Sequence, residues 1–381
     1  MKRIVFFTYS DNVFTQDYIK ELLKTGDFKI TVIGFQPTRW TAFYKKRHIR
    51  YIDVPRIYLP EQSSIKDYLK YLRARLFIFL NRDRFDFIHV HSVVENSLKH
   101  AKMLMGRRGK LILTYWGGDI FSKSNEQFMR EKHYLDCAYK INVMTDRMRE
   151  ILDHKYDFRY HDKCRVVDFG NTTIGYMDQY VSKYGKERLL RLSRKKYGMP
   201  QDKIVIAVGY CGRKQQQHLH VIDQIRKYPA EVKKNIFLYC HMPYDIESKN
   251  YIAKVRNALK LCGCDYLLSE QYLTFSQIAA MKMGVDIMVH AGSYDAISAS
   301  MIEYIYAGKI VLNPEWVGYD LYEQFGIRDI QYHDFEDLGI KLAHVLKNIC
   351  QDQMAVERNQ EIIAEMYRWD RVISKWLELY Q

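Results

Sequence analysis

The 381-residue sequence lacks any long apolar run, has only 7 proline residues and contains no low-complexity tract. A membrane-spanning helix needs about 20 apolar residues, and no stretch here comes close. The first residues, MKRIVFFTYSDN, hold an apolar run of only five, which is too short for a signal peptide. These shortages argue against a membrane-spanning protein, a disordered chain and a repeat array, and they predict a folded protein.

The cysteines form no CxxC pair, and their number, seven, is odd. Regularly spaced pairs would be expected of a disulfide framework or a structural zinc site. The 13 histidines add no zinc-binding pattern, and no DxD triplet occurs. We therefore expect unpaired thiols in a reducing compartment, a cytoplasmic protein and no bound metal ion.

The excess of basic over acidic residues lies in the first half alone. Residues 1–200 contain 39 Lys and Arg against 22 Asp and Glu, whereas residues 201–381 contain 20 against 23. Within the first half, residues 38–84 interleave twelve basic and four acidic residues with leucine and aromatic side chains. This mixture suits contact with anionic lipid headgroups, and it is also normal for solvated helices whose apolar stripe is core. Nucleic acid is not expected as a partner, because no RNP, helix-turn-helix or zinc-finger signature accompanies the charge.

Short apolar runs alternate with helical patterns throughout the chain, which predicts parallel sheets covered by helices on both faces. Strands are expected at residues 4–8, 30–35, 87–90, 111–115, 140–144 and 165–168 in the first half, and at 204–208, 236–240, 266–268, 286–289 and 310–312 in the second. The breakers Gly198, Met199 and Pro200 follow a basic helical segment and mark a boundary. A final stretch with Trp369 and Trp376 on one face predicts one or two more helices.

The chain is longer than one hydrophobic core usually serves, so two domains are expected. We assign residues 1–185, with a C-terminal helix at 363–381, to an N-terminal Rossmann-like domain that binds the acceptor. Residues 199–362 would form a second Rossmann-like domain that binds a nucleotide. Open sheets of this kind bind ligands at the carboxyl ends of their strands.

The most informative segment is VHAGSYDAISASMIEYIYAGK, residues 289–309. A buried strand ends there, a loop of small residues follows, Ser298 can cap a helix and Gly308 can end it. The free amides of residues 299–301 at the helix start would favour a phosphate. Asp295 precedes this helix and Glu303 lies one turn along it, which matches the order sugar, diphosphate and ribose. The same two residues would also be ordinary as a turn residue and a solvated helix residue.

This segment resembles the signature of family-4 retaining GT-B glycosyltransferases, in which an acidic residue, seven others and Glu precede an Ala-Gly turn. Asp295 stands where that family usually has Glu, and Glu303, Ala307 and Gly308 match. Further segments are similar in the same order: FIHVH at 87–91, LTYWGGDI at 113–120, FGNT at 169–172, VG at 208–209 and YLTFSQ at 272–277. The resemblance implies a GT-B fold, with two doubly wound α/β domains facing across a cleft and a C-terminal helix returning to the N-terminal domain.

The resemblance also implies roles for individual residues. It gives Asp119, Asp295 and Glu303 as catalytic residues, with Asp119 orienting or deprotonating the acceptor or, alternatively, capping a helix. The donor-binding set is Gly209, Arg213, Lys214, His241, Tyr272, Ser298, Ala299, Ser300 and Glu303. The acceptor or cleft set is Ser10, Asn12, His91, Trp116, Gly118 and His290. Where the family supplies an Arg and a Lys for the diphosphate, this sequence has Tyr210 and Gln215, so Arg213 and Lys214 are the expected substitutes.

The expected function is retaining transfer of a sugar from a nucleotide-diphosphate sugar, without a metal ion, to a glycan or a polyprenyl-linked sugar in surface polysaccharide synthesis. The expected location is cytoplasmic or peripheral on the inner face of the plasma membrane, reached through the basic N-terminal half. Three alternatives remain open: a GT-B sugar-nucleotide 2-epimerase, a non-catalytic sugar-nucleotide-binding relative, and a basic nucleic-acid-binding module.

Overall fold

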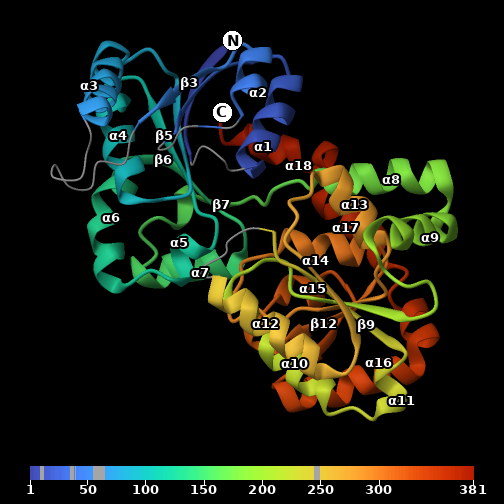
Figure 1. Ribbon diagram of the computed structural model, residues 1–381. Coiled ribbons are helices and arrows are strands. Elements are labelled where there is room, and N and C mark those ends of the chain that lie inside the picture. Colours follow the sequence, from blue (N-terminus) through green and yellow to red (C-terminus); the bar gives the residue numbers. More distant parts are fainter. Residues whose placement is uncertain (9–12, 35–37, 39, 55–64, 244–248) are drawn as a thin grey trace. The chain divides into compact units, whose positions relative to one another are not determined.

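The computed structural model describes residues 1–8, 13–34, 38, 40–54, 65–243 and 249–381 (Figure 1). The chain forms two compact units, one of residues 1–170 with 372–381 and the other of residues 171–371. No helix within the described residues is both long and apolar enough to cross a bilayer.

The N-terminal unit is built on a seven-stranded parallel sheet of order β3-β2-β1-β4-β5-β6-β7. Its interior strand β1 carries five consecutive fully buried residues, as expected of a parallel strand covered on both faces. The strands are β1 (Lys2–Thr8), β2 (Phe28–Gly34), β3 (Arg50–Asp53), β4 (Phe87–His91), β5 (Lys110–Thr114), β6 (Ala138–Val143) and β7 (Cys164–Val166). The helices of this unit are α1 (Val13–Lys24), α2 (Thr41–Lys46), α3 (Ile65–Leu80), α4 (Glu95–Met105), α5 (Gly118–Phe121), α6 (Asn125–Cys137) and α7 (Asp146–Lys155).

The end of the chain packs into the N-terminal unit, as predicted. In helix α18 (Trp369–Glu378), the fully buried Trp376 donates its indole N–H to the carbonyl of Asp168, 2.9 Å away. Beyond the helix, the Tyr380 hydroxyl lies 2.8 Å from the Tyr18 hydroxyl and 2.6 Å from Nδ1 of His89. Two buried aromatic side chains therefore attach the last residues to α1 and β4.

The C-terminal unit contains a six-stranded parallel sheet of order β10-β9-β8-β11-β12-β13. Side chains alternate across it: Val205 and Ala207 of β8 enter one hydrophobic core, while Ile206 and Val208 enter the other. The strands are β8 (Ile204–Val208), β9 (Ile236–His241), β10 (Asp265–Ser269), β11 (Ile287–Val289), β12 (Ile310–Pro314) and β13 (Ile330–Tyr332).

Helices cover both faces of this second sheet. One core includes residues of α8 (Thr172–Tyr184), α9 (Lys186–Tyr197), α13 (Phe275–Met283), α14 (Ala299–Tyr306), α15 (Asp320–Gln324) and α17 (Asn359–Tyr367). The other includes residues of α10 (His218–Arg226), α12 (Lys249–Cys262) and α16 (Phe335–Ala355), and α11 (Ala230–Lys233) connects α10 to β9. The two doubly wound parallel sheets expected from the sequence are confirmed.

The unit boundary lies after Gly170, whereas the sequence analysis assigned residues up to 185 to the N-terminal domain. The physical reason is the packing of α8, which contacts α13 and α14 (Figure 1). Ile174 and Met177 of this helix are buried in the core of the C-terminal unit. The helical segment 171–197 thus belongs with the second sheet, and at the other end the division falls at 371 rather than 363.

Candidate active site

Several predicted site residues, two of the donor-binding set and one of the acceptor or cleft set, lie at the carboxyl ends of strands in the C-terminal unit. Gly209 follows β8, His241 is the last residue of β9 and His290 follows β11. All three strands are parallel and lie within one sheet, so these residues share one edge. This is the edge at which open α/β sheets bind ligands.

Asp295 is held by the loops that follow β8 and β11. Its Oδ2 accepts a hydrogen bond of 2.9 Å from the Tyr210 hydroxyl, and its Oδ1 accepts from the backbone N–H of Ala296 at 2.8 Å. The fully buried His290 ring stacks on Tyr210 and on Tyr319. Asp295 is therefore fixed by an aromatic stack beneath its loop.

The proton on His290 can be assigned from its partner. Nδ1 lies 2.9 Å from Oδ1 of Asn313, and because that oxygen can only accept, Nδ1 carries the proton. Burial lowers the pKa of His290, although Asp295 and Asn313 oppose this, so the ring is neutral. Its Nε2 is then an acceptor, 3.8 Å from Oδ2 of Asp295, and no described residue donates to it. Two acceptors thus face the same small region.

Helix α14 begins directly after this loop, with Ser298 as its N-cap. The Ser298 hydroxyl accepts from the N–H of Met301 at 3.3 Å, and the Ser298 N–H donates to the Tyr319 hydroxyl. Of the three backbone amides predicted to bind an anion, that of Met301 is therefore already hydrogen-bonded to the N-cap. The N–H groups of Ala299 and Ser300 have no acceptor among the described residues, and they carry the partial positive charge of a helix start.

Glu303 is buried, with 6% of its surface exposed. Its Oε1 accepts from the Thr173 hydroxyl at 2.6 Å and from the Asn171 side-chain amide at 3.3 Å. Its Oε2 forms an ion pair with Lys282 of α13. The sequence placed Glu303 at the ribose, and these three donors leave its carboxylate room for about one more hydrogen bond.

Lys282 is the residue of this site that the sequence analysis missed. Only 3% of its surface is exposed, and besides Glu303 its ammonium group contacts the hydroxyl of Ser300 at 2.6 Å and the carbonyl of Ser300 at 3.1 Å. Burial lowers the pKa of Lys282, and the Glu303 carboxylate opposes this. A signal was available, because a single charge inside the apolar stretch AAMKMGV is expected to be paired when buried.

The loop after β8 was expected to supply cations for the diphosphate from Arg213 and Lys214. Gly209 has a φ of +64°, and a Cβ there would lie 2.5 Å from Nε2 of the buried His218. Arg213 and Lys214, the predicted substitutes, are both exposed, whereas Gln215 is used within the site: its backbone carbonyl accepts from the N–H of Ser293 at 3.0 Å. Positive charge in this loop is therefore available only from exposed side chains.

The two remaining donor-site predictions differ in burial. Nε2 of His241 lies 3.0 Å from the carbonyl of Gln271, and burial lowers the pKa of His241 to about 4, so its ring is neutral at pH 7. Tyr272, one residue further along, is exposed. His241 thus holds the loop after β10, from which Tyr272 projects.

Asp119 lies in the first turn of α5 in the N-terminal unit, but it does not cap that helix, whose N-cap is Gly117. Its carboxylate accepts three backbone hydrogen bonds, from Trp116 at 2.7 Å, from Gly117 at 2.9 Å and from Val93 at 2.9 Å. Burial raises the pKa of Asp119, and the three amides partly offset this. Asp119 joins the loops that follow β4 and β5.

The predicted cleft residues of the N-terminal unit include an aromatic group at the end of β4. His91 is fully buried and stacks on Tyr18 and Trp376, while Trp116 packs on Phe169 with ring centroids 4.5 Å apart. Burial lowers the pKa of His91 to about 3, so this ring is also neutral. Gly118 is exposed at the start of α5. The predicted residues Ser10 and Asn12 lie outside the described residues.

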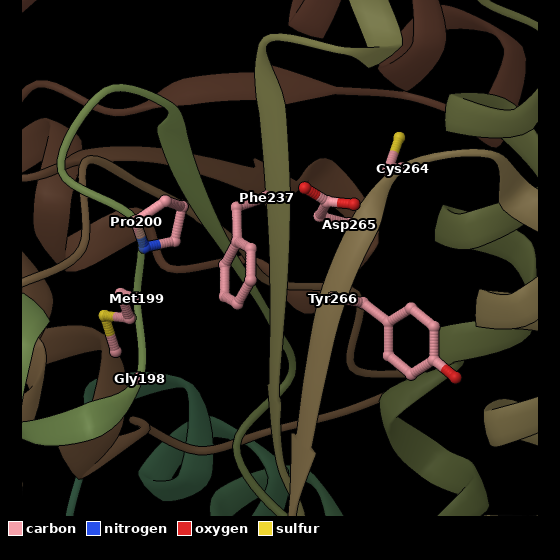
Figure 2. A pocket seen from close by; sticks show the side chains of 7 residues that line it. All are labelled: Gly198, Met199, Pro200, Phe237, Cys264, Asp265 and Tyr266. Atoms are coloured by element: carbon pink, nitrogen blue, oxygen red, sulfur yellow. The ribbon is translucent and has the colours of Figure 1, made fainter.

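In the described part of the chain, no group of three or more His, Cys, Asp or Glu side chains is arranged to hold a metal ion. A separate pocket of about 530 Å³ lies at the amino ends of β9 and β10, on the opposite edge of the second sheet from Asp295. Figure 2 shows its lining, with the Phe237 ring between the Met199–Pro200 turn and Asp265. None of the predicted site residues lines it.

The family comparison identifies the N-terminal part of the chain. Residues 3–152 match the family model described as "Glycosyl transferase 4-like". The chain is a glycosyltransferase. A search of curated proteins found no match.

Solved structures show that this glycosyltransferase has the GT-B fold over its whole length. A glycosyltransferase from Rickettsia africae superposes with a TM-score of 0.75 at 17% identity, covering 100% of this chain and 97% of that one. The Anabaena protein HepE, crystallised with UDP, gives 0.75 at 12% identity, with 99% of each chain covered. Sucrose-phosphate synthase from Thermosynechococcus elongatus gives 0.74 at 13% identity, covering 100% and 98%.

Proposed function

We propose that the enzyme transfers a sugar from a nucleotide-diphosphate sugar with retention of anomeric configuration, and that the donor binds at the start of α14. The observation that carries this proposal is the order of polar groups there. Two acceptors, Asp295 and Nε2 of His290, lie in the segment that leads into α14, and two donors without an acceptor among the described residues, the amides of Ala299 and Ser300, lie at its start. Sugar hydroxyls donate to the first pair, and diphosphate oxygens accept from the second.

The charge balance of the site limits how the diphosphate is held. Lys282 is the buried cation beneath the start of α14, but Glu303 neutralises it. The donor phosphates are therefore stabilised by helix-start amides, with Arg213 and Lys214 adding charge from the exposed loop. The predicted roles of Gly209, His241 and Tyr272 in donor binding and of Glu303 at one ribose hydroxyl are retained in this proposal.

Catalysis then depends on stabilising the departing nucleoside diphosphate. Asp295 would bind donor-sugar hydroxyls. Asp119 would orient the acceptor by holding the loop that follows β4 against the loop that follows β5. We further propose a glycan or polyprenyl-linked acceptor, a role in surface polysaccharide assembly, and an anionic membrane as the partner of the basic N-terminal half. HepE was crystallised with UDP and with UDP-glucose, which makes uridine nucleotides the first donors to test.

The substitution Ala299→Pro tests the donor site with little cost to the fold. Ala299 is the first residue of α14 and its N-cap is extended, so proline is tolerated while one predicted phosphate donor is lost. A charge-assisted hydrogen bond contributes about 1.5–3 kcal/mol, so donor affinity should fall by roughly tenfold or more. Thermal shifts with UDP-, GDP- and dTDP-sugars measure that affinity, because a ligand of the native state raises stability.

The matched control is Asn125→Pro, at the first position of the capped helix α6, which should leave donor binding unchanged. Asp295→Asn weakens the acceptor proposed for the donor-sugar hydroxyls, so it should lower both donor affinity and nucleoside diphosphate release, each by roughly tenfold or more. The absence of stabilisation by any nucleotide sugar would contradict the proposal. Binding without release, with or without acceptors, would identify a non-catalytic relative, and an epimerised sugar formed without acceptor would identify an epimerase.

A further inference from the structure

Helix α3 is apolar on two opposite sides. Its inner side, with Ala74, Phe77 and Ile78, is buried, and the helix packs against β3 and α4 (Figure 1). Its outer side carries six large apolar residues that are each between 44% and 68% exposed: Tyr68, Leu69, Leu72, Leu76, Phe79 and Leu80. A helix that is apolar on two opposite sides is normally covered on both of them.

The exposed residues form one continuous stripe. Leu69, Leu72, Leu76 and Phe79 are spaced by three, four and three residues, which places them on one face of the helix. At about 100° per residue, this face is centred opposite Ala74 and Ile78. We call these four residues, with Tyr68 and Leu80, the outer face of α3.

Arginine side chains border the outer face. Arg73 and Arg75 are exposed and lie on the two flanks of the stripe, about 100° to either side of Ala74. At the end of the helix, Asp83 accepts hydrogen bonds from the backbone N–H groups of Arg107 and Arg108, so that two further exposed arginines lie beside it. The nearby carboxylate of Asp83 is thus engaged by backbone amides, and the border is positive.

We propose that the outer face of α3 docks on an anionic lipid bilayer, with its apolar side chains among the acyl chains and its arginines at the headgroups. Apolar residues flanked by cations are what a helix lying in the membrane interface requires. A second copy of the chain fits less well, because symmetric pairing of this face would bring like charges together. The proposal locates the membrane contact proposed above and does not depend on sugar transfer.

Vesicle co-sedimentation of the full-length protein tests this docking. Wild-type protein should bind vesicles of phosphatidylcholine mixed with phosphatidylglycerol and bind phosphatidylcholine alone much more weakly. L72Q/L76Q should bind the anionic vesicles roughly 30-fold more weakly, since two leucine side chains lose their apolar burial. R73Q/R75Q should lose about as much on anionic vesicles and little on neutral ones, because each arginine acts through headgroup charge.

The matched control for the leucine pair is L192Q/L261Q, two exposed leucines of the C-terminal unit, which should bind as wild type. All of these sites are exposed, so circular dichroism should show an intact fold. The proposal is overturned if wild type does not bind anionic vesicles, or if the control loses as much binding as L72Q/L76Q. It is also overturned if ultracentrifugation without lipid shows a dimer that L72Q/L76Q dissociates, which would make the face a protein interface. Donor-induced thermal shifts should be unchanged in every α3 variant, which separates this test from that of the donor site.

Discussion

Replacing Lys282 with methionine should destabilise the C-terminal unit strongly. Lys282 and Glu303 form an ion pair whose side chains are 4% and 8% exposed. Methionine has nearly the shape of the lysine stem, so the main change is the loss of the cation beside a buried carboxylate. Removing one partner of a buried pair costs about 3–5 kcal/mol, because the other charge remains without compensation.

The structure favours the lower end of that range. Glu303 keeps hydrogen bonds from Thr173 and Asn171 in the Lys282→Met variant, and these donors still stabilise its negative charge. We therefore expect a loss of about 3 kcal/mol. With a urea dependence of about 3 kcal/mol per M, the unfolding midpoint should fall by about 1 M. Urea titration followed by circular dichroism measures this shift.

A double-mutant cycle distinguishes the ion pair from a packing effect. Gln at position 303 can still accept from Thr173 and Asn171, so in Lys282→Met with Glu303→Gln no charge is left buried and unpaired. The double variant should be more stable than the sum of the two single losses predicts, by about 1–3 kcal/mol. The surface pair Lys203–Asp265 provides the control, since Lys203→Met there should cost less than about 1 kcal/mol. Additive single losses, or an effect of Lys282→Met no larger than that of Lys203→Met, would refute the reasoning.

Two further predictions concern buried histidines of the C-terminal unit. Burial lowers the pKa of both His218 and His241 to about 4 from an unfolded value of 6.5. As pH falls below 6.5, the unfolded state binds protons before the folded state does, so the folded protein should lose about 3 kcal/mol of stability for each histidine by pH 4. In urea titrations across this range, His241→Asn should lose less stability than wild type or the exposed control His133→Gln. An equal loss in all three proteins would contradict the lowered pKa of His241. Gly209→Ala should lower the free energy of unfolding by about 1–3 kcal/mol, because Gly209 has a φ of +64° and an added Cβ would lie 2.5 Å from His218. His218→Ala should remove the steric part of this loss. Thermal unfolding of both single variants and the double variant measures the two effects, and purely additive losses would show that the contact is unimportant.

Much of the fold follows from local patterns in the sequence. Apolar runs bounded by polar loops located β8 at its observed bounds, because a buried parallel strand leaves a regular signature within a few residues. The segment from Asp295 to Glu303 was placed correctly on a loop and a capped helix for the same reason. Ser298 signalled the start of this helix and Gly308 its end.

Which side chains come into contact depends on how distant segments pack. The pairing of Lys282 with Glu303, and the docking of α8 on the second sheet, depend on contacts between segments distant in the chain, which no local pattern encodes. In α3 the sequence offers apolar residues on two opposite sides, so periodicity could not choose the buried face. The packing of Ala74 and Ile78 on the N-terminal unit made that choice and left the outer face exposed. Local sequence patterns specify the helices and strands and supply the chemical groups, whereas packing between distant segments sets which charges are neutralised and which apolar surface still faces outward.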